Sequence, residues 1–273
     1  MFTHHLKGFA ARAGAVTLLS VGMIAGLAVT PALAQTRTAS ATLTYTVMGD
    51  SYSAGSGAGN ETGQCAQSTA GYANDVAAMT GATLTNIACS GFTTTQVTSM
   101  EVPYLSPTTK LITITAGGND VGWTTAVGAC LTSTTAVCKA AVANSIYLMS
   151  KVPKNATTML KAIKAKSPHA RILYLGYPRL FEPANMPALG FTPTQVTGAK
   201  LLNGAADLLN AILAFTSLSN RVAFVPVAYK FAGHGVPSSQ PWLNYPGGPD
   251  PFAFHPNATG YLDGYAAAVR PFL

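Results

Sequence analysis

Residues 44–57, TYTVMGDSYSAGSG, run from β-branched and aromatic residues directly into small and polar ones. The first half, as far as Met48, has the composition of a buried β-strand. Gly49, Asp50 and Ser51 follow at its carboxyl end. A serine in this position is a nucleophile, an N-cap of the next helix, or part of a glycine-rich phosphate loop, and the rest of the chain decides among these roles.

The rest of the chain repeats this pattern of a strand followed by a helix. Short β-branched runs alternate with longer segments whose apolar residues recur at steps of three and four. The alternation predicts βαβ units and a mostly parallel sheet with helices on both faces, in one α/β domain over residues 35–273. The predicted strands are 42–48, 83–87, 111–115, 171–175 and 222–227, and the predicted helices are 72–80, 139–166, 194–217 and 257–269.

The N-terminus has the three parts of a secretory signal peptide. Lys7 and Arg12 supply positive charge, residues 13–29 are almost wholly apolar, and residues 31–34 read PALA. We therefore predict a signal peptide over residues 1–34 and a secreted protein. A retained membrane anchor is the alternative, because the apolar run approaches the ~20 residues that span a bilayer. No later segment is expected to be long and apolar enough to span one.

The charge of the chain excludes extensive contact with nucleic acid. The sequence has 16 Lys and Arg against 9 Asp and Glu, a net charge of +7. Two of the basic residues lie in the predicted signal peptide, and the others are scattered apart from Lys161, Lys164 and Lys166, whose spacing is typical of a solvated helix face. The thin excess is compatible with transient contact with a lipid surface, and we expect a monomer.

The chain has four cysteines, which in an exported protein indicate disulfides. Four cysteines allow three connectivities, and we favour Cys65–Cys89 and Cys130–Cys138 because each pair closes a short loop. A zinc site is the competing interpretation, but the spacings are not those of metal ligands and no histidine lies near them. We expect no metal and no cofactor.

A phosphate loop is the weakest of the three roles for Ser51. The glycines at 55, 57 and 59 do not complete G-x-G-x-x-G, because Asn60 follows them, and no G-x-x-x-x-G-K-[ST] occurs. These later glycines are interpreted as slack in the chain that leaves the site. Capping remains open, but it does not explain why other predicted strands end in similar small, polar residues.

Small and polar residues also follow the predicted strands 83–87 and 111–115, as Ser90-Gly91 and as Gly117-Gly118-Asn119-Asp120. The carboxyl ends of parallel strands meet at one edge of a sheet, where ligand sites gather. At that edge the Ser51 and Gly91 N–H groups and the Asn119 amide are candidate donors to an oxyanion. The nucleophile is therefore the role of Ser51 that accounts for all three stretches.

These stretches resemble the blocks of the SGNH, or GDSL, hydrolases. Gly49-Asp50-Ser51 looks like the first block with its nucleophile, Ser90-Gly91 is similar to the second, Gly117-Gly118-Asn119-Asp120 to the third, and His255-Pro256 to the last. The resemblance spans residues 49–256 and is closest to the secreted actinobacterial lipases and esterases. It implies a three-layer α/β/α sandwich with a flavodoxin-like, mostly parallel five-stranded sheet. It also implies acyl-ester hydrolysis through Ser51 and His255, with an oxyanion hole of Ser51 N–H, Gly91 N–H and the Asn119 side chain.

Three histidines remain after the predicted signal peptide. His169 precedes a predicted strand and so lies at the wrong edge of the sheet, whereas His234 follows the last strand and either lines the site or bonds within a loop. His255 is our choice of general base, because Pro256 begins a helix after it and the preceding loop reaches over the strand ends.

The group that orients His255 is where the chain departs from the family pattern. Many relatives have an aspartate three residues before the histidine, but this position is Phe252. We favour the Phe252 backbone carbonyl in a dyad, with the Asp250 carboxylate as the rival. Trp123 and Phe254, like Phe92 and Trp242, are candidates for an apolar acyl-binding rim or for the core.

The predicted function is thus a secreted serine esterase or lipase acting on a small-molecule or lipid ester. A phospholipase or acyltransferase of the same fold is the alternative, since it shares every catalytic residue. A secreted binding protein that kept the fold without the chemistry is the alternative of another class.

Overall fold

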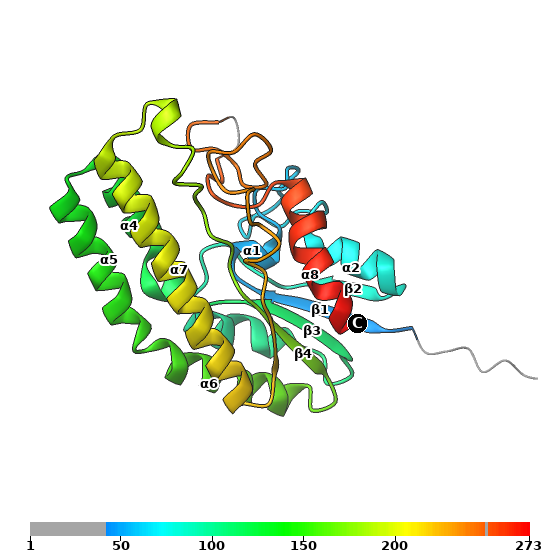
Figure 1. Cartoon of the computed structure of the whole chain (residues 1–273). Coiled ribbons are helices and arrows are strands. Elements are labelled where there is room, and N and C mark those ends of the chain that lie inside the picture. The colour runs from blue at the N-terminus through cyan, green and yellow to red at the C-terminus, as the bar shows by residue number, and fades with distance from the viewer. Residues whose placement is uncertain (1–41, 249–250) are drawn as a thin grey trace, which may run out of the picture. The chain divides into compact units, whose positions relative to one another are not determined.

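The computed structural model describes residues 42–248 and 251–273, so the predicted signal peptide over 1–34 lies outside the described residues. Within them, five parallel strands form one sheet in the order β2-β1-β3-β4-β5 (Figure 1). This is the flavodoxin-like order. The α/β fold is confirmed, with strands β1 Thr44–Gly49, β2 Thr83–Asn86, β3 Leu111–Thr115, β4 Arg171–Leu175 and β5 Ala223–Val225.

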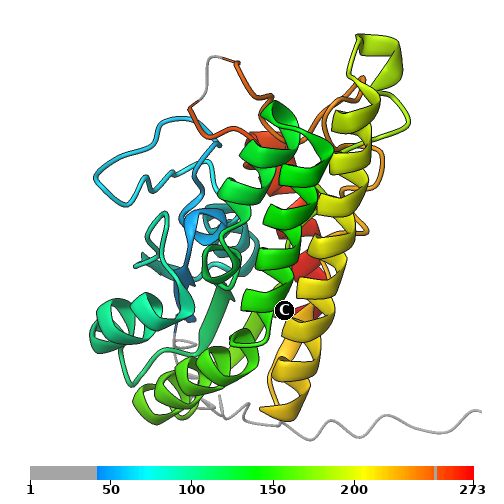
Figure 2. The ribbon, with the colours of Figure 1, turned by 90° about the vertical axis from the view of Figure 1, so that its left-hand side faces the viewer.

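Helices cover both faces of this sheet, as the right-handed crossovers of parallel strands require. One face carries α4 to α7, and the other carries α2 and the C-terminal helix (Figure 1). Figure 2 shows α5 and α7 side by side on the first face, where they pack on each other. The helices are α1 Ser51–Ala54, α2 Tyr72–Thr80, α3 Thr94–Gln96, α4 Trp123–Thr132, α5 Thr135–Met149, α6 Val152–Lys166, α7 Pro193–Ser219 and α8 Ala267–Val269.

The three central strands make the core, because helices cover them on both sides. Every residue of β3 is buried, and only the first residues of β1 and β4 are not. The edge strand β2 instead alternates between exposed and half-buried residues. Near-continuous burial of this kind is typical of parallel strands between two helical layers.

Two helix predictions need correction. The predicted helix over 139–166 is two helices, α5 and α6, because Pro153 lacks an N–H and its ring clashes with the carbonyl four residues earlier, where α5 ends at Met149. The predicted helix over 257–269 is mostly a π-helix, Gly260–Ala266, which continues into α8. Helix α4 was not predicted, since its threonines and Gly128 obscure the helical period.

When only length and composition are considered, the prediction that no segment after the N-terminus could span a membrane is wrong. Among the described residues one helix, α7, is long and apolar enough to do so. In the fold it packs against α4, α5 and α6, and its polar side chains bond to a neighbouring segment. In this fold α7 is therefore one of the helices that pack within the α/β domain.

The structure contains both favoured disulfides, Cys65–Cys89 and Cys130–Cys138. The first ties the loop after α1 to the segment that directly follows β2, and Ser90 N–H donates to the Cys65 carbonyl beside it. The second closes the turn between α4 and α5.

Candidate active site

Ser51 is the first residue of α1, directly after β1. Asp50 is the N-cap of this helix: its Oδ1 accepts the Tyr52 N–H at 3.0 Å and the Thr115 hydroxyl at 2.6 Å. The other oxygen, Oδ2, accepts the Tyr177 hydroxyl at 2.5 Å. Ser51 thus stands at a helix N-terminus whose turn is fixed by a buried carboxylate.

Gly49 allows this turn to lie close to the neighbouring strand. Its φ is +119°, and a Cβ at this position would lie 2.0 Å from the Thr115 carbonyl oxygen. Its N–H donates to Glu101 Oε2 at 2.7 Å. A side chain at position 49 would therefore push β1 away from β3 and displace Ser51.

His255 meets Ser51 across 204 residues of chain. Its Nε2 lies 2.7 Å from Ser51 Oγ, within hydrogen-bond reach. His255 is 8% exposed and lies between two aromatic residues. The centroid of its ring is 5.0 Å from that of Tyr52 and 5.7 Å from that of Trp123. The Tyr52 hydroxyl donates to the Phe254 carbonyl at 2.9 Å, which fixes the histidine loop to the serine helix.

The other ring nitrogen of His255 faces its own loop. Nδ1 lies 3.2 Å from the Ala253 carbonyl oxygen, and the Phe252 carbonyl accepts the backbone N–H of His255 at 3.1 Å. Asp250 lies outside the described residues. The roles of Phe252 and Asp250 in orienting the ring therefore stay predictions.

The two other predicted oxyanion donors follow β2 and β3. Asn119 begins a short 3-10 helix after β3, and its Nδ2 donates to the Phe92 carbonyl at 3.0 Å. Gly91, next to Phe92, has φ +85°. Over residues 42–248 and 251–273, neither Ser51 N–H nor Gly91 N–H donates a hydrogen bond. Both N–H groups therefore remain available to a ligand.

Asp120 fixes the loop that carries Gly91. Its carboxylate accepts the Thr94 N–H at 2.8 Å and also the Thr94 hydroxyl, at the start of α3. The residue is thus a structural partner of Thr94. Asn119 and Asp120 together join the loops after β2 and β3.

Burial perturbs two carboxyl groups beneath the serine. Desolvation raises the pKa of Asp50 to about 6, while its bonds from Thr115, Tyr177 and Tyr52 act in the opposite direction. Desolvation also raises the pKa of Glu101 to about 9, against the lowering effect of the Gly49 N–H. At neutral pH Asp50 is therefore ionised and Glu101 is protonated.

The later glycines of the opening stretch are not all slack, and that interpretation is wrong for Gly57. A Cβ on Gly57, whose φ is +92°, would lie 2.8 Å from His255 Cβ and 2.9 Å from the Pro256 carbonyl oxygen. Gly59 differs, because a Cβ there would meet nothing within 4 Å. Gly57 therefore lets the chain leaving α1 pass directly beneath the histidine.

The remaining histidines lie elsewhere. His169 is exposed in the turn before β4. His234 stacks on Trp242, with ring centroids 3.8 Å apart, and its Nδ1 lies 2.8 Å from the Gln240 carbonyl oxygen, so it bonds within its loop. In the described part of the chain no three His, Cys, Asp or Glu side chains come together as a metal site would need.

Three contributors to this site were missed from sequence. Glu101 carried a signal, since it is one acid in the otherwise uncharged run QVTSMEVPYL, which is unusual for a buried segment. Tyr52 and Tyr261 carried none, although Tyr261 donates to the Ser56 carbonyl at 2.8 Å. Their contacts join residues about 200 positions apart, which no local pattern reveals.

Comparison with known proteins places this chain in one family. The model of the GDSL-like lipase/acylhydrolase family matches residues 47–262. Lipase 1 of Streptomyces coelicolor is 33% identical over 260 residues, which cover 93% of this chain and 96% of that protein.

Two crystal structures share the fold at similar identity. The extracellular lipase of Streptomyces rimosus is 32% identical with a TM-score of 0.78, over 84% of this chain and 99% of that one. The phospholipase A1 of Streptomyces albidoflavus is 31% identical with a TM-score of 0.77, over 85% and 99%.

Proposed function

The chain belongs to the GDSL-like lipase/acylhydrolase family and is an ester hydrolase, and from this premise we propose that it is a secreted serine esterase or lipase acting through Ser51 and His255. The observation that carries the proposal is the 2.7 Å contact between Ser51 Oγ and His255 Nε2. A serine hydroxyl becomes an effective nucleophile when a base within this distance accepts its proton.

The reaction has two halves. Ser51 Oγ attacks the acyl carbonyl carbon while His255 Nε2 takes the hydroxyl proton, and the resulting tetrahedral intermediate expels the alcohol, which receives that proton from His255. Water then attacks the acyl-enzyme with the same base, and the acid leaves as Ser51 regains its proton. No cofactor is needed to balance either half.

The oxyanion of each tetrahedral intermediate is held by Ser51 N–H, Gly91 N–H and the Asn119 amide. Two features support this assignment: the backbone N–H groups have no acceptor among the described residues, and the Phe92 carbonyl orients the Asn119 amide. Donors fixed before the reaction stabilise developing charge without reorganisation. Removing one such donor costs about 100- to 1,000-fold in kcat.

A backbone carbonyl completes the catalytic dyad in our proposal. Sequence favoured the Phe252 carbonyl, and the neighbouring Ala253 carbonyl lies 3.2 Å from Nδ1. A carbonyl from this loop fixes the tautomer that presents Nε2 to Ser51. The Asp250 carboxylate is the rival for the same nitrogen.

Hydrolysis of p-nitrophenyl butyrate by the purified mature protein tests the mechanism. Ser51→Ala and His255→Ala are expected to lose activity by about 10,000-fold or more while retaining the wild-type circular dichroism spectrum and unfolding midpoint. His234→Ala is the matched control and is expected to keep activity. If wild type and Ser51→Ala were equally active, or equally inert on a broad ester panel, the mechanism would be wrong.

Phospholipid is the second candidate substrate, because a structural relative at 31% identity is a phospholipase A1. An acyltransferase shares the same first half-reaction. Release of fatty acid from phosphatidylcholine or triglyceride, and of acetate from a polysaccharide acetate, divides these possibilities, and transfer to added alcohol identifies a transferase. A non-catalytic binding protein is disfavoured by the intact contact between serine and histidine, and the Ser51→Ala comparison tests it directly.

Secretion is proposed from the N-terminal pattern, and one relative is an extracellular lipase. Expression of the full chain in an actinobacterial host is expected to release a protein that begins at Gln35. An N-terminal sequence that starts at Met1 in the membrane fraction would indicate a retained anchor instead.

A further inference from the structure

An apolar cavity lies between α4, α5, α7 and the segment that follows β4. Its volume is about 70 Å³, several times the ~10–15 Å³ that one water molecule needs. Its helical walls carry Ala126, Val142, Met149 and Leu202. A cavity of this size with predominantly apolar walls suits an apolar part of a ligand.

One end of the cavity adjoins the reacting groups. Asp50 and Tyr52, which flank Ser51, line it, and so does Gly118, which precedes Asn119. Trp123 lines it as well, with its ring 5.7 Å from that of His255. One end of the cavity therefore lies beside the segments that carry the reacting groups.

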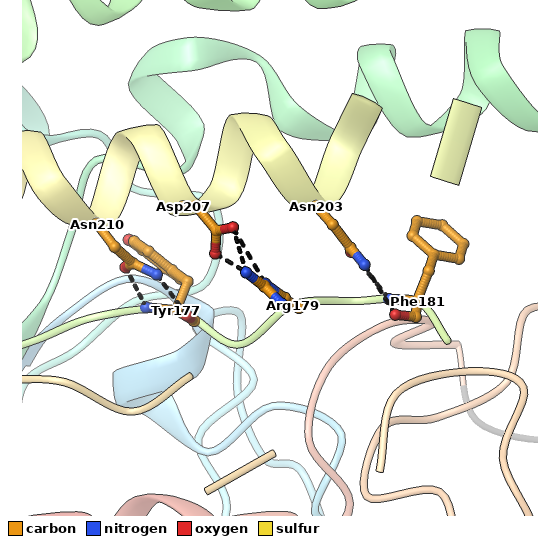
Figure 3. Close-up of polar contacts among 6 residues, drawn as sticks. All are labelled: Tyr177, Arg179, Phe181, Asn203, Asp207 and Asn210. Carbon is orange, nitrogen blue, oxygen red and sulfur yellow. Dashed lines mark hydrogen bonds and ion pairs between the residues drawn. The ribbon is translucent and has the colours of Figure 1, made fainter. Parts of the chain in front are cut away.

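Polar crosslinks hold one wall of this cavity in place (Figure 3). The Asn210 side chain accepts the Tyr177 N–H and donates to the Tyr177 carbonyl, both at 2.8 Å. Nearer the start of α7, Asn203 accepts the Phe181 N–H at 3.2 Å and donates to the Phe181 carbonyl at 2.8 Å. Each asparagine thus satisfies both backbone groups of one residue, as a neighbouring strand would.

Between the two asparagines, Arg179 and Asp207 form an ion pair at 2.6 Å (Figure 3). The residues on either side of Arg179, Pro178 and Leu180, line the cavity instead. Arg179 thus directs its charge toward α7, while Pro178 and Leu180 present apolar side chains to the cavity. The wall is fixed to α7 by five side-chain contacts with the segment and so cannot simply collapse inward.

We propose that this cavity holds the acyl chain of the substrate ester and that Ala205 and Ala206 of α7 limit the chain length it accepts. The proposal rests on the proposed function, because the acyl chain enters here only if Ser51 attacks its carbonyl. The walls offer no charged side chain except Asp50, whose carboxylate is already bonded. They therefore suit a hydrocarbon and not a sugar or a charged head group.

The spacing of residues along α7 gives the length of the acyl chain that the cavity accepts. Leu202 and Leu209 both line the cavity, and seven residues at 1.5 Å per residue extend over about 10 Å. An extended hydrocarbon advances ~1.3 Å per bond, given a C–C length near 1.5 Å. The cavity therefore fits an acyl chain of about eight carbons.

Substitutions that fill the cavity test this. Ala205→Leu and Ala206→Leu are each expected to lower the ratio of kcat/KM for p-nitrophenyl octanoate to that for the acetate by about ten-fold or more. Ala211→Leu, at an exposed position of the same helix, is the matched control and is expected to keep the wild-type ratio. Folded cavity variants that retain the wild-type ratio would overturn the proposal. The proposal would also be overturned if the cavity variants changed the preference for the alcohol part of the ester and left the preference for acyl chain length as in wild type.

A second measurement uses the wild-type cavity. Trp123 and Trp242 are the two tryptophans of the chain, so Trp242→Phe leaves Trp123 as the single tryptophan. A p-nitrophenyl octylphosphonate brominated in its alkyl chain forms a bond from Ser51 Oγ to phosphorus and releases p-nitrophenol. The bound bromine is expected to quench Trp123 by half or more, relative to the unbrominated probe.

The outcomes separate the two proposals. Labelling of Ser51, verified by mass, without quenching of Trp123 would overturn the cavity proposal and leave the mechanism standing. Equal labelling of wild type and Ser51→Ala would instead contradict the proposed function. Quenching together with the shift in the octanoate ratio supports both.

Discussion

Glu101 gives the sharpest test of the electrostatics beneath the nucleophile. The carboxyl group is 2% exposed and accepts the Gly49 N–H at 2.7 Å, two residues before Ser51. Burial raises its pKa from 4.5 to about 9. Since glutamine has the shape of a protonated glutamate and offers the same acceptor to Gly49, Glu101→Gln is expected to keep kcat within a few-fold of wild type at pH 7.

The stability of the two proteins should diverge with pH. Between pH 4.5 and about 9 the native state holds a proton on Glu101 and the unfolded state does not, so wild-type stability falls as pH rises. The favourable contribution of the neutral carboxyl is fully present below pH 4.5 and is lost as pH rises through the folded pKa of about 9. The slope is up to about 1.4 kcal/mol per pH unit. Glutamine has no such proton, so the variant gains stability relative to wild type as pH rises.

Urea unfolding at pH 5, 6, 7 and 8, with the disulfides intact, measures this difference. The free energy of unfolding of Glu101→Gln minus that of wild type is expected to increase across the series, by at least about 2 kcal/mol in total. Glu182→Gln controls for the loss of a carboxylate that accepts a backbone N–H, because Glu182 binds Gly233 N–H at 2.9 Å. Parallel curves for wild type and Glu101→Gln would refute the reasoning.

Three further substitutions test the positioning of the dyad. Tyr52→Phe leaves a buried carbonyl of the histidine loop without its donor and is expected to cost about 1–3 kcal/mol in urea unfolding, with a lower kcat; an unchanged kcat would contradict the positioning role. Gly57→Ala places a Cβ 2.8 Å from His255 Cβ and is expected to lower kcat by about 100-fold, whereas Gly59→Ala, strained in the same φ region but unobstructed, should cost far less. Asp250→Asn is expected to lower kcat by less than about ten-fold, and a loss of several hundred-fold would show that the carboxylate orients the histidine.

The sheet and the reacting groups could be predicted because each leaves a local trace in the sequence. A β-branched run that ends in Gly49-Asp50-Ser51 indicates a strand with a tight turn at its carboxyl end, and parallel strands bring their carboxyl ends together regardless of loop length. The break at Pro153 was equally local and was visible in the sequence. A single helix over 139–166 was nevertheless predicted, because apolar residues recur at helical spacing on both sides of Pro153.

The contacts that set the geometry could not be predicted in the same way. Glu101 reaches Gly49 across 52 residues, and Tyr52 reaches Phe254 across 202. Nothing in the composition around Gly57 distinguishes it from Gly59, yet only Gly57 lies against His255. Such roles depend on which segments pack together, and that is decided by the complete fold and not by any window of sequence.

Tyr177 connects the chemistry to the cavity. Its hydroxyl donates to Asp50 Oδ2 and accepts the Gly118 N–H at 3.1 Å, while its backbone is held by Asn210. Asp50 in turn caps the helix that begins at Ser51. Because these groups are buried, losing one bond leaves its partner unsatisfied, so a movement of the cavity wall must be transmitted to the serine or resisted by it. An acyl chain that fits the wall therefore leaves the nucleophile in its attacking position, and a chain that displaces the wall does not.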